Sequence, residues 1–493
     1  MKNNRKIQLF AAALGLAAIL AGFTGKAFAL NDTVTEPTGV ETRIVLVDSS
    51  TENLLAGRQT VFTNGVLRIT TGGRYIISGK HEGQIIIQAA RTDAVELVLD
   101  NLTLHNPNGP AIYAPRSLRV ELILADGSVN AVSDGRHPND ENNAAIFIQH
   151  DLIISGNGTL NVNGNFNHGI RAQDTLTVKS GVINVKAAGD ALRGRDAVIV
   201  QDGTFSLTAG GDGIQSNNNA NAELGYVRIN GGTFTINAGD DGIQAETAVT
   251  VNGGSLTIIT KDDGITTNGS VLITGGAVRI TDSYEGIEGL NVTITGGDIY
   301  ISSRDDGLNA REHGIANTRG RFVRGGSPTN ANIFVRVTGG NLQIQSLTDG
   351  IDSNNNFFLE GGTLQISGPS RGVEGAIDVD GSVFINGGKL ITAGSVISVS
   401  AQSKQPSVLV TYAQQFPTGA FIEIKDTSGN TLLDYTSKNA FIISAFTSPD
   451  FVIGKTYSLY VNRQKIQDIT LSGIVTAIGN SNSNRGIGGR GRF

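Results

Sequence analysis

Acidic side chains recur at one position of a repeated Asp-Gly-Ile element, and this recurrence is the strongest chemical signal in the sequence. The apolar residue of the element falls at Ile170, Leu192, Ile214, Ile243, Ile265, Ile287, Leu308 and Ile351. The position two residues earlier, which we call the acidic column, is occupied by His168, Asp190, Asp212, Asp241, Asp263, Glu285, Asp306 and Asp349, and Arg371 before Gly372-Val373 is expected to continue it. Further acids precede the column at Asp240, Asp262 and Asp305, and others follow the turn at Glu288, Asp352 and Glu374.

Stacked acids of this kind favour a bound cation. If the repeats stack at the strand spacing of about 4.8 Å, two neighbouring carboxylates repel by roughly 1 kcal/mol even in water. Ca²⁺ suits them because it is a hard ion that takes six to eight oxygen ligands. We therefore expect Ca²⁺ as the cofactor, with ligands among Asp212, Asp240, Asp241, Asp262, Asp263, Glu285, Asp305, Asp306 and Asp349. The alternative is that Asp-Gly is a turn in which the Asp accepts backbone hydrogen bonds.

Basic residues beside the column would give it a different chemistry. Arg193, Arg195, Lys261 and Arg311 are the basic residues that the repeat register places close to the acids. In a polysaccharide lyase, one of them would act as the base that removes a proton from a metal-bound uronate, which requires hydrogen-bond reach and a suitably lowered pKa. No motif in the sequence forces such geometry. Binding of a polysaccharide without catalysis is therefore the preferred interpretation, and a polysaccharide lyase is the alternative.

The elements that would hold these residues are short strands. A Gly-Gly or similar pair has its second glycine at Gly232, Gly254, Gly276 and Gly297, at steps of 22, 22 and 21 residues. Apolar residues alternate with polar ones on both sides of each pair, which is typical of strands with one buried face. Two markers that share one period indicate a solenoid. Three short strands and three turns in 22 residues predict one coil of a parallel β-helix.

The expected organisation follows from where this period begins and ends. We expect an all-β chain with a lead-in over 30–60, a parallel β-helix over 61–403, an antiparallel β cap over 404–475 and a disordered Gly/Asn/Arg-rich tail over 476–493. Residues 1–29 resemble a signal peptide, with a positive start, an apolar run and an Ala-Phe-Ala cleavage signal that would leave Leu30 at the mature N-terminus. The expected location is therefore extracellular or on the cell surface, although a retained anchor would show the same apolar run.

Composition excludes several classes of function. The 493 residues contain no Cys and no Trp, which removes disulfides, thiolate nucleophiles and Cys-ligated zinc. The formal net charge of -6 argues against a nucleic-acid partner. Once the signal peptide is removed, no membrane insertion is expected.

Several segments together resemble those of a known family. They are 72–79 (GGRYIISG), 95–99 (VELVL), 165–170 (NFNHGI), 210–215 (GGDGIQ), 241–247 (DGIQAET) and 426–430 (DTSGN). In this order they are similar to segments of the secreted bacterial carbohydrate-binding domain-containing β-helix proteins. This resemblance implies a right-handed β-helix similar to pectate lyases, Ca²⁺ sites, and binding of plant-wall polysaccharides such as cellulose and polygalacturonate. His168 departs from the family pattern, because Asp is more frequent at that position.

The sequence thus leaves three functions open. One is a Ca²⁺-dependent carbohydrate-binding protein, another is a pectate-type lyase that acts by β-elimination, and the third is an adhesin or matrix protein. The partner expected for the first two is a polysaccharide, since a solenoid offers long faces that suit an extended polymer.

Overall fold

The computed structural model describes residues 41–46, 60–136, 143–312, 330–371, 374–395 and 397–479. Contacts divide the chain into two units, Met1–Val40 and Glu41–Phe493. The first unit, which contains the expected signal peptide, lies outside the described residues. The described part of the second unit consists of strands and turns, and it contains no helix long and apolar enough to cross a membrane.

Alternating side chains explain the strands. In β24 (Ser255–Thr260), Leu256 and Ile258 are fully buried, whereas Ser255 and Thr257 face outward. The same alternation repeats in successive strands, which therefore bury one face against a shared interior. The predicted all-β class is confirmed.

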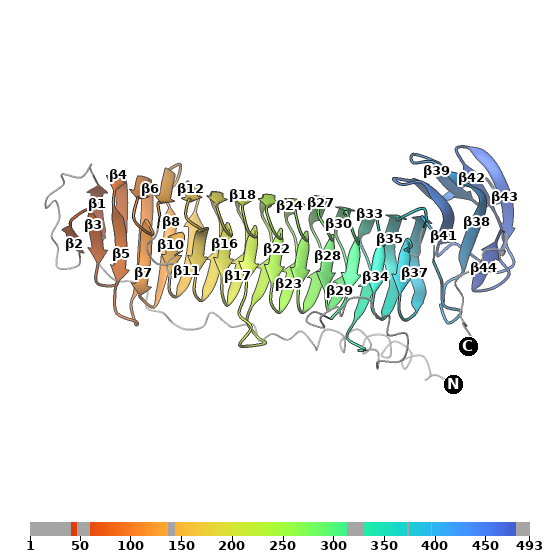
Figure 1. Cartoon of the computed structure of the whole chain (residues 1–493), viewed down its shortest axis with the longest axis horizontal. Helices are drawn as coiled ribbons and strands as arrows, with labels where there is room; N and C mark the ends of the chain where they lie inside the picture. Colours follow the sequence, from red (N-terminus) through yellow and green to blue (C-terminus); the bar gives the residue numbers. More distant parts are fainter. Residues whose placement is uncertain are drawn as a thin grey trace, which may run out of the picture. The chain divides into compact units, whose positions relative to one another are not determined.

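Two long sheets and a small cap sheet contain all of the described strands (Figure 1). The 14-stranded sheet consists of β2 (Thr60–Thr63), β3 (Val66–Ile69), β5 (Gln84–Gln88), β7 (Ile112–Arg116), β10 (Ala144–Ile148), β13 (His168–Ala172), β16 (Leu192–Gly194), β19 (Ile214–Ser216), β22 (Ile243–Ala245), β25 (Ile265–Thr267), β28 (Ile287–Gly289), β31 (Leu308–Ala310), β34 (Ile351–Ser353) and β36 (Ile377–Val379).

The 26-stranded sheet contains two rows of strands joined by four long strands. The first row is β1 (Thr42–Leu46), β8 (Arg119–Leu124), β11 (Asp151–Gly156), β14 (Thr175–Val178), β17 (Ala197–Val200), β20 (Tyr226–Ile229), β23 (Ala248–Val251), β26 (Ser270–Ile273), β29 (Asn291–Ile294) and β32 (Phe334–Val337). The second row is β9 (Val129–Asp134), β12 (Thr159–Gly164), β15 (Val182–Ala187), β18 (Thr204–Ala209), β21 (Thr233–Ala238), β24, β27 (Ala277–Asp282), β30 (Asp298–Ser302) and β33 (Asn341–Gln345). The joining strands are β4 (Gly73–Glu82), β6 (Ala94–Asn106), β35 (Asn356–Ser367) and β37 (Val383–Ala393).

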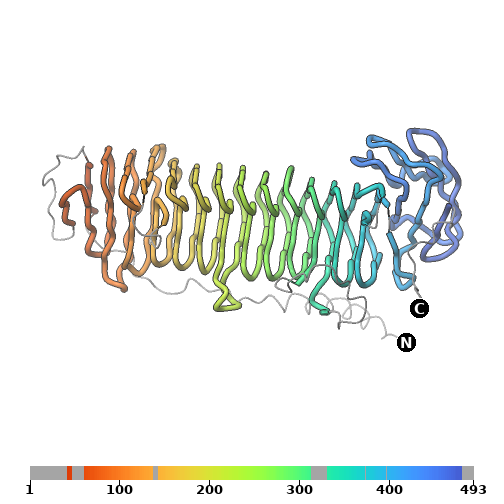
Figure 2. The backbone as a smooth tube through the Cα atoms, viewed as in Figure 1, coloured from red at the N-terminus to blue at the C-terminus, as the bar shows by residue number. Residues whose placement is uncertain are grey.

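Successive repeats lie side by side in sequence order (Figure 2). Ile214 pairs in parallel with Ile243, Ile243 with Ile265, and Ile265 with Ile287. All four side chains are fully buried, so the predicted register and the inward direction of these residues are confirmed. This stack is part of one continuous apolar core that extends from Ile44 to Val399.

Two positions of the repeat are occupied by glycine because another residue would not be tolerated there. Gly254 and Gly276, the second members of their pairs, have φ of 91° and 89°, which is the left-handed region that glycine tolerates. At Gly264, within the Asp-Gly-Ile element, an added Cβ would lie 2.6 Å from the carbonyl oxygen of Gly286. The element therefore needs glycine because the next repeat packs directly against it.

The cap follows the last repeat. Its sheet is β39 (Phe421–Lys425), β40 (Thr431–Thr436), β42 (Thr456–Val461) and β43 (Gln464–Thr470), all antiparallel. Three further strands, β38 (Ser407–Phe416), β41 (Phe441–Thr447) and β44 (Val475–Ile478), extend the 26-stranded sheet. A second apolar core fills the cap.

Two boundaries and one position of the acidic column differ from the sequence expectations. β1 lies within the expected lead-in, yet it pairs with β4. β44 reaches into the segment expected as the tail because it pairs with β38, and the tail beyond residue 479 lies outside the described residues. Arg371 does not continue the acidic column, because Ile351 pairs with Ile377 and the column position there is Gly375.

Candidate functional site

The acidic column is a ladder of hydrogen bonds between repeats. The backbone amide of Asp241 donates to Oδ1 of Asp212 at 3.0 Å, and the amide of Asp263 donates to Oδ1 of Asp241 at 3.0 Å. Glu285 donates in the same way to Asp263 at 3.0 Å. The acids thus accept backbone hydrogen bonds, as the turn interpretation expected, but the donors lie in the next repeat rather than in the same turn.

Burial and mutual repulsion make the charged form of these acids costly. Burial raises the pKa of Asp212 to about 7, and the charge of Asp190 adds to the rise. Burial, together with the charge of Asp212, raises the pKa of Asp241 to about 8. Asp263 has a pKa of about 7 because of its burial and the nearby Glu288. A cation held beside these groups would offset the repulsion between them.

The first of three acid clusters, the Asp240 cluster, consists of Asp240, Asp241 and Asp262, whose oxygens lie within 4.8 Å of one another. Asp240 and Asp262 are exposed, and only Asp241 is partly buried. The cluster brings together one column acid and the two acids that precede the column in neighbouring repeats. Solvent screens its charges more than those of the other clusters.

The Glu285 cluster consists of Asp263, Glu285 and Glu288, again with oxygens within 4.8 Å. Glu288 is fully buried and Glu285 is 3 % exposed. Arg311 approaches Glu288 at 2.7 Å and Glu285 at 3.8 Å, so a cation of the protein lies beside these carboxylates. Burial and the shared contact with Glu288 raise the pKa of Glu285 to about 10.

A neutral oxygen adds to the donors of the Glu285 cluster. The amide nitrogen of Asn309 donates to Glu285 at 3.0 Å, and Asn309 pairs in register with Glu288. The Asn309 Oδ1 atom is buried and has no hydrogen-bond partner within the described ranges. Carboxylates with a side-chain carbonyl are the donor set of a hard cation, and the donors here fit Ca²⁺. Arg311 competes for the same oxygens.

The Asp349 cluster consists of Asp349, Glu374 and Asp378, also with oxygens within 4.8 Å. Asp352 pairs in register with Asp378 and adds a fourth carboxyl. Burial and the contact with Glu374 raise the pKa of Asp349 to about 9, and burial with the charge of Asp306 raises the pKa of Asp352 to about 7. Across the described part of the chain, no Lys, Arg or His forms a salt bridge with any of these four acids.

The structure places some of the nine acids predicted as ligands in the three clusters and the others outside them. Six of them fall in the clusters, namely Asp240, Asp241, Asp262, Asp263, Glu285 and Asp349. Asp212, Asp305 and Asp306 belong to none of the three, and the Thr348 hydroxyl lies 2.7 Å from both Asp305 and Asp306.

Three cluster members were absent from the predicted ligands. Glu288 and Glu374 had been recognised as acids beyond the turn, but sequence spacing alone did not show that they point back toward the column. Asp378 is not among the predicted ligands because the sequence pattern aligns the last repeat on Arg371. Aligning Ile351 with Ile377 would have placed Asp378 opposite Asp352.

The four basic residues of the lyase alternative have different surroundings. Arg193 forms an ion pair with Asp190 at 3.0 Å, and Arg195 lies 3.5 Å from Asp196. Lys261 is exposed. Burial lowers the pKa of Arg311, but the hydrogen bond with Glu288 and the nearby acids outweigh that effect, so its pKa is raised. A raised pKa opposes the loss of a proton that a general base requires.

His168, where the sequence departs from the family pattern, is the first residue of the column. At this end of the column the acid Asp190 has a basic partner within the protein, Arg193. The Nδ1 atom of His168 lies 3.0 Å from the amide of Asp190, and its Nε2 lies 3.1 Å from Nη1 of Arg193. Burial opposes ionisation of Asp190, but the hydrogen bond and charge of His168 and the charge of Arg193 prevail and lower the pKa of Asp190. Here Arg193 supplies a cation from the protein itself.

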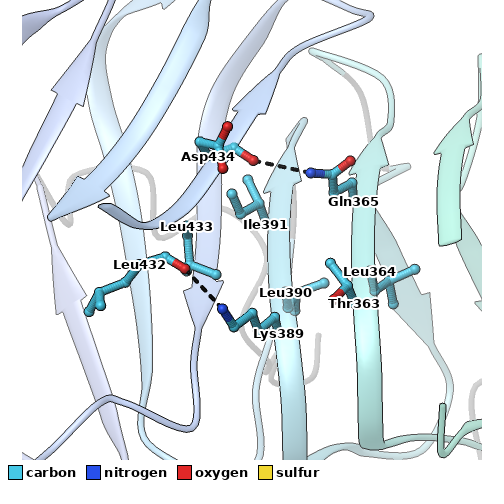
Figure 3. A pocket seen from close by; sticks show the side chains of 9 residues that line it. All are labelled: Thr363, Leu364, Gln365, Lys389, Leu390, Ile391, Leu432, Leu433 and Asp434. Carbon is cyan, nitrogen blue, oxygen red and sulfur yellow. Dashed lines mark hydrogen bonds between the residues drawn. The ribbon is translucent and has the colours of Figure 1, made fainter. Parts of the chain in front are cut away.

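A pocket of about 200 Å³ lies elsewhere, between β35, β37 and the cap strand β40 (Figure 3). Lys389 donates to the Leu432 carbonyl at 3.3 Å, and Gln365 donates to the Asp434 carbonyl at 3.1 Å. Both polar side chains bind the backbone of β40, so they fasten the cap to the last repeats. The pocket borders the second row of strands, whereas the acidic column borders the 14-stranded sheet.

Comparison with known proteins assigns the chain to a class. The family of carbohydrate-binding domain-containing proteins matches residues 63–326 and 261–403, which is more than half of the chain. The chain belongs to this family.

Two individual proteins are similar to parts of the chain. A carbohydrate-binding domain-containing protein of Acetivibrio thermocellus is 37 % identical over 128 residues, which cover 24 % of this chain and 45 % of that protein, so the match spans less than half of the relative. A solved structure of a polysaccharide lyase-like protein from C. thermocellum, a gadolinium derivative, is 32 % identical and covers 48 % of this chain and 97 % of its own, with a TM-score of 0.46.

Proposed function

We propose that this protein is a secreted, Ca²⁺-dependent carbohydrate-binding protein that recognises plant-wall-type polysaccharides such as polygalacturonate and cellulose, with little or no catalysis. Family membership supports carbohydrate as the ligand class. We further infer that the two long sheets wind into a right-handed parallel β-helix of about 22 residues per coil. The register supports the coil length, since Ile243 pairs with Ile265 and Ile265 with Ile287.

The observation that carries the Ca²⁺ proposal is the Asp349 cluster. Asp349 is 4 % exposed, yet it lies within 4.8 Å of the oxygens of Glu374 and Asp378. Glu374 is partly buried and Asp378 is exposed, so the cost falls mainly on Asp349. A buried carboxylate this close to two others destabilises the fold unless it is protonated or paired with a cation. Since no basic side chain within the described ranges pairs with them, Ca²⁺ is the counter-ion that we propose. When bound, it would offset two of the negative charges of these acids.

Polysaccharide binding fits the chemistry of this face. The acids repel a polyuronate as long as they are charged and unpaired, so we expect polyuronate binding at this end to require Ca²⁺. A neutral polymer such as cellulose has no carboxylates to repel, so its binding need not depend on the ion. The stacked repeats present the contacts along one direction, as an extended polymer requires.

The surroundings of the basic residues support binding over β-elimination. Arg193 and Arg311, the two that lie closest to buried acids, are both held as cations in ion pairs. A lyase needs a base that has lost its proton beside the substrate. A lyase remains the alternative, and exposed Lys261 is then the first base to test.

A pull-down panel with the purified chain tests this proposal. Insoluble cellulose and immobilised polygalacturonate are each offered with Ca²⁺ or with chelator, and ultraviolet absorbance is followed for unsaturated products. We expect polygalacturonate retention to fall with chelator and absorbance to stay flat. Retention on neither polymer with Ca²⁺ present would refute the proposal, and rising absorbance would support the lyase.

The matched variants are Asp349→Asn with Asp378→Asn in the site, and Asp202→Asn as the control. Asp202 is an exposed acid whose side chain accepts the neighbouring amide of Gly203 at 2.8 Å. The control should bind as the wild type does, while the double variant should lose the part of polygalacturonate binding that depends on Ca²⁺.

A further inference from the structure

Tyr284 is an exposed aromatic residue in the turns that carry the acidic column. It lies in the turn between β27 and β28 and directly precedes Glu285, a member of the Glu285 cluster. Tyr284 is 47 % exposed, and no other aromatic residue within the described ranges is exposed to this extent. Solvent therefore reaches a large ring beside the acids, and the proposed function gives this ring no role.

Tyr284 occupies a position that acids hold in the neighbouring repeats. The residue that precedes the column is Asp262 in the repeat before Tyr284 and Asp305 in the repeat after it. The amide of Tyr284 donates to the Asp262 carbonyl at 2.7 Å, and the amide of Asp305 donates to the Tyr284 carbonyl at 2.8 Å. Successive repeats are about 4.8 Å apart. The aromatic residue thus has an acidic residue on each side of it along the stack.

A hydrogen bond restrains the Tyr284 ring. The hydroxyl of Tyr284 donates to the side chain of Asp305, and this bond, together with the charge of Asp305, raises the pKa of Tyr284 to about 12. The ring therefore leans toward the following repeat. Asp305 is partly exposed, and the Thr348 hydroxyl lies 2.7 Å from it. Because a carboxylate can accept about four hydrogen bonds, Asp305 keeps acceptor capacity for a hydroxyl of a ligand.

The backbone around Tyr284 is held in place by one arginine. Nε of Arg304 donates to the Ser283 carbonyl at 3.1 Å, and its Nη2 donates to the Lys261 carbonyl at 2.5 Å. Arg304 also forms an ion pair with Asp282 at 3.3 Å. This side chain connects the turns of three successive repeats. The surface that carries Tyr284 is therefore ordered before a ligand arrives, which lowers the entropic cost of binding.

A second exposed apolar side chain lies in the same line of turns. Leu347 is 62 % exposed and lies between β33 and β34, two repeats beyond Tyr284. This separation corresponds to roughly 10 Å along the stack. Asp305 belongs to the repeat between them. Apolar contacts and a hydrogen-bond acceptor therefore alternate along the stack, as recognition of an extended chain of sugar rings requires.

The chemistry of these side chains matches a neutral sugar better than a uronate. The faces of a pyranose ring whose hydroxyls are equatorial carry only C–H groups, which can pack on an aromatic ring. The hydroxyls around its edge can donate to carboxylates, and hydrogen bonds to a charged acceptor are strong. The rings of polygalacturonate carry carboxylates, which the charges of Asp262 and Asp305 repel.

We propose that Tyr284 and Asp305, with Leu347 further along the stack, form a metal-independent stacking subsite for the neutral pyranose rings of a glucan such as cellulose. This inference rests on the proposed function, because family membership makes carbohydrate the ligand class. It assigns the neutral polymer to a line of turns in which Tyr284 supplies the stacking face and Asp305 accepts from sugar hydroxyls.

Retention on insoluble cellulose in chelator tests the subsite. Tyr284→Ala removes the stacking face and should weaken binding by about tenfold. Tyr284→Phe keeps the ring and loses only the hydroxyl, so its affinity should stay within about threefold of the wild type. Asp305→Asn replaces a charged acceptor with a neutral one and should lie between these two variants.

The control is Tyr226→Ala, because Tyr226 is a partly exposed tyrosine of β20, on a different row of strands, with Arg228 at 5.2 Å from its ring centre. The control should bind cellulose as the wild type does, and all variants are compared at temperatures below their melting transitions. Unchanged affinity in Tyr284→Ala, or an equal loss in Tyr284→Phe and Tyr284→Ala, would overturn the subsite.

The wild type separates this inference from the proposed function. Retention on polygalacturonate with Ca²⁺ but not on cellulose would overturn the subsite alone, and so would cellulose binding that chelator abolishes. Retention on neither polymer with Ca²⁺ present would overturn the proposed function and the subsite together.

Discussion

The backbone amide of Asp263 donates to the carboxylate of Asp241 at 3.0 Å, so an acid of one repeat fixes the backbone of the next. Asp212 with Asp241 and Asp263 with Glu285 repeat this relationship. The column acids therefore have a structural role that does not depend on a metal. They also place carboxylates close enough for the clusters to form.

The ladder predicts that shape matters more than charge at Asp241. Asp241→Ala should lower the stability by about 1–3 kcal/mol, because the amide of Asp263 loses its acceptor. Asp241→Asn keeps an acceptor oxygen. Because burial raises the pKa of the Asp241 carboxyl to about 8, that group is mostly uncharged at neutral pH, and the substitution should cost less than the alanine variant without Ca²⁺. Thermal unfolding in chelator measures both. Equal losses in the two variants would contradict the ladder.

The stack of isoleucines predicts a large loss of stability when one of its buried side chains is shortened. Ile265→Ala removes a fully buried side chain between Ile243 and Ile287 and should cost about 2–5 kcal/mol. Ile259→Ala, at a position that is 44 % exposed, should change stability by less than about 0.5 kcal/mol. Denaturant unfolding of both variants provides the comparison, and similar losses at the two positions would show that Ile265 does not pack as described.

The Asp190 ion pair predicts a pH-dependent contribution to stability. Its folded pKa is lowered below the unfolded value of about 3.9, so the contribution is present above that value and is lost as the pH falls through the folded pKa. Asp190→Asn should therefore lower the melting temperature at pH 7, by an amount that corresponds to about 1.5–3 kcal/mol. The difference from the wild type should shrink below about pH 4. A difference that grows on acidification would contradict the assignment.

Ca²⁺ removal should destabilise the protein through ligand linkage. At a free concentration of one hundred times Kd, a single site adds about 2.7 kcal/mol. Chelator should therefore lower the melting temperature of the wild type, while Asp349→Asn with Asp378→Asn should respond less. Asp212→Asn, outside the three clusters, should keep the full response. An identical shift of the melting temperature in all three proteins would show that the Asp349 cluster does not bind the Ca²⁺ that stabilises the fold.

Much of the fold could be predicted because the period is read directly from the sequence. The Asp-Gly-Ile and Gly-Gly markers gave the register of Ile214, Ile243, Ile265 and Ile287, and the inward direction of these side chains follows from strand alternation. The period fails where the repeats change length. The step from Ile351 to Ile377 has no Asp-Gly pair, so Arg371 was placed in the column by mistake.

The site was predicted only in part. Sequence spacing gives the repeat to which a residue belongs, but it does not give the direction in which the side chain points at the turn between two strands. Asp263 and Glu285 follow from the column itself. Glu288 lies on β28, whose three residues are all buried, and its carboxylate comes within 4.8 Å of those of Asp263 and Glu285. Nothing in the spacing shows that Arg311 occupies one side of the Glu285 cluster, since it comes from the following repeat.

Calorimetric titration of Ca²⁺ into metal-free protein tests the central claim most directly. The wild type should release or absorb heat with saturation, and Asp349→Asn with Asp378→Asn should lose at least one of the binding events while Asp202→Asn keeps all of them. A wild-type titration that does not differ from dilution of Ca²⁺ into buffer would contradict the claim that these acid clusters hold the ion.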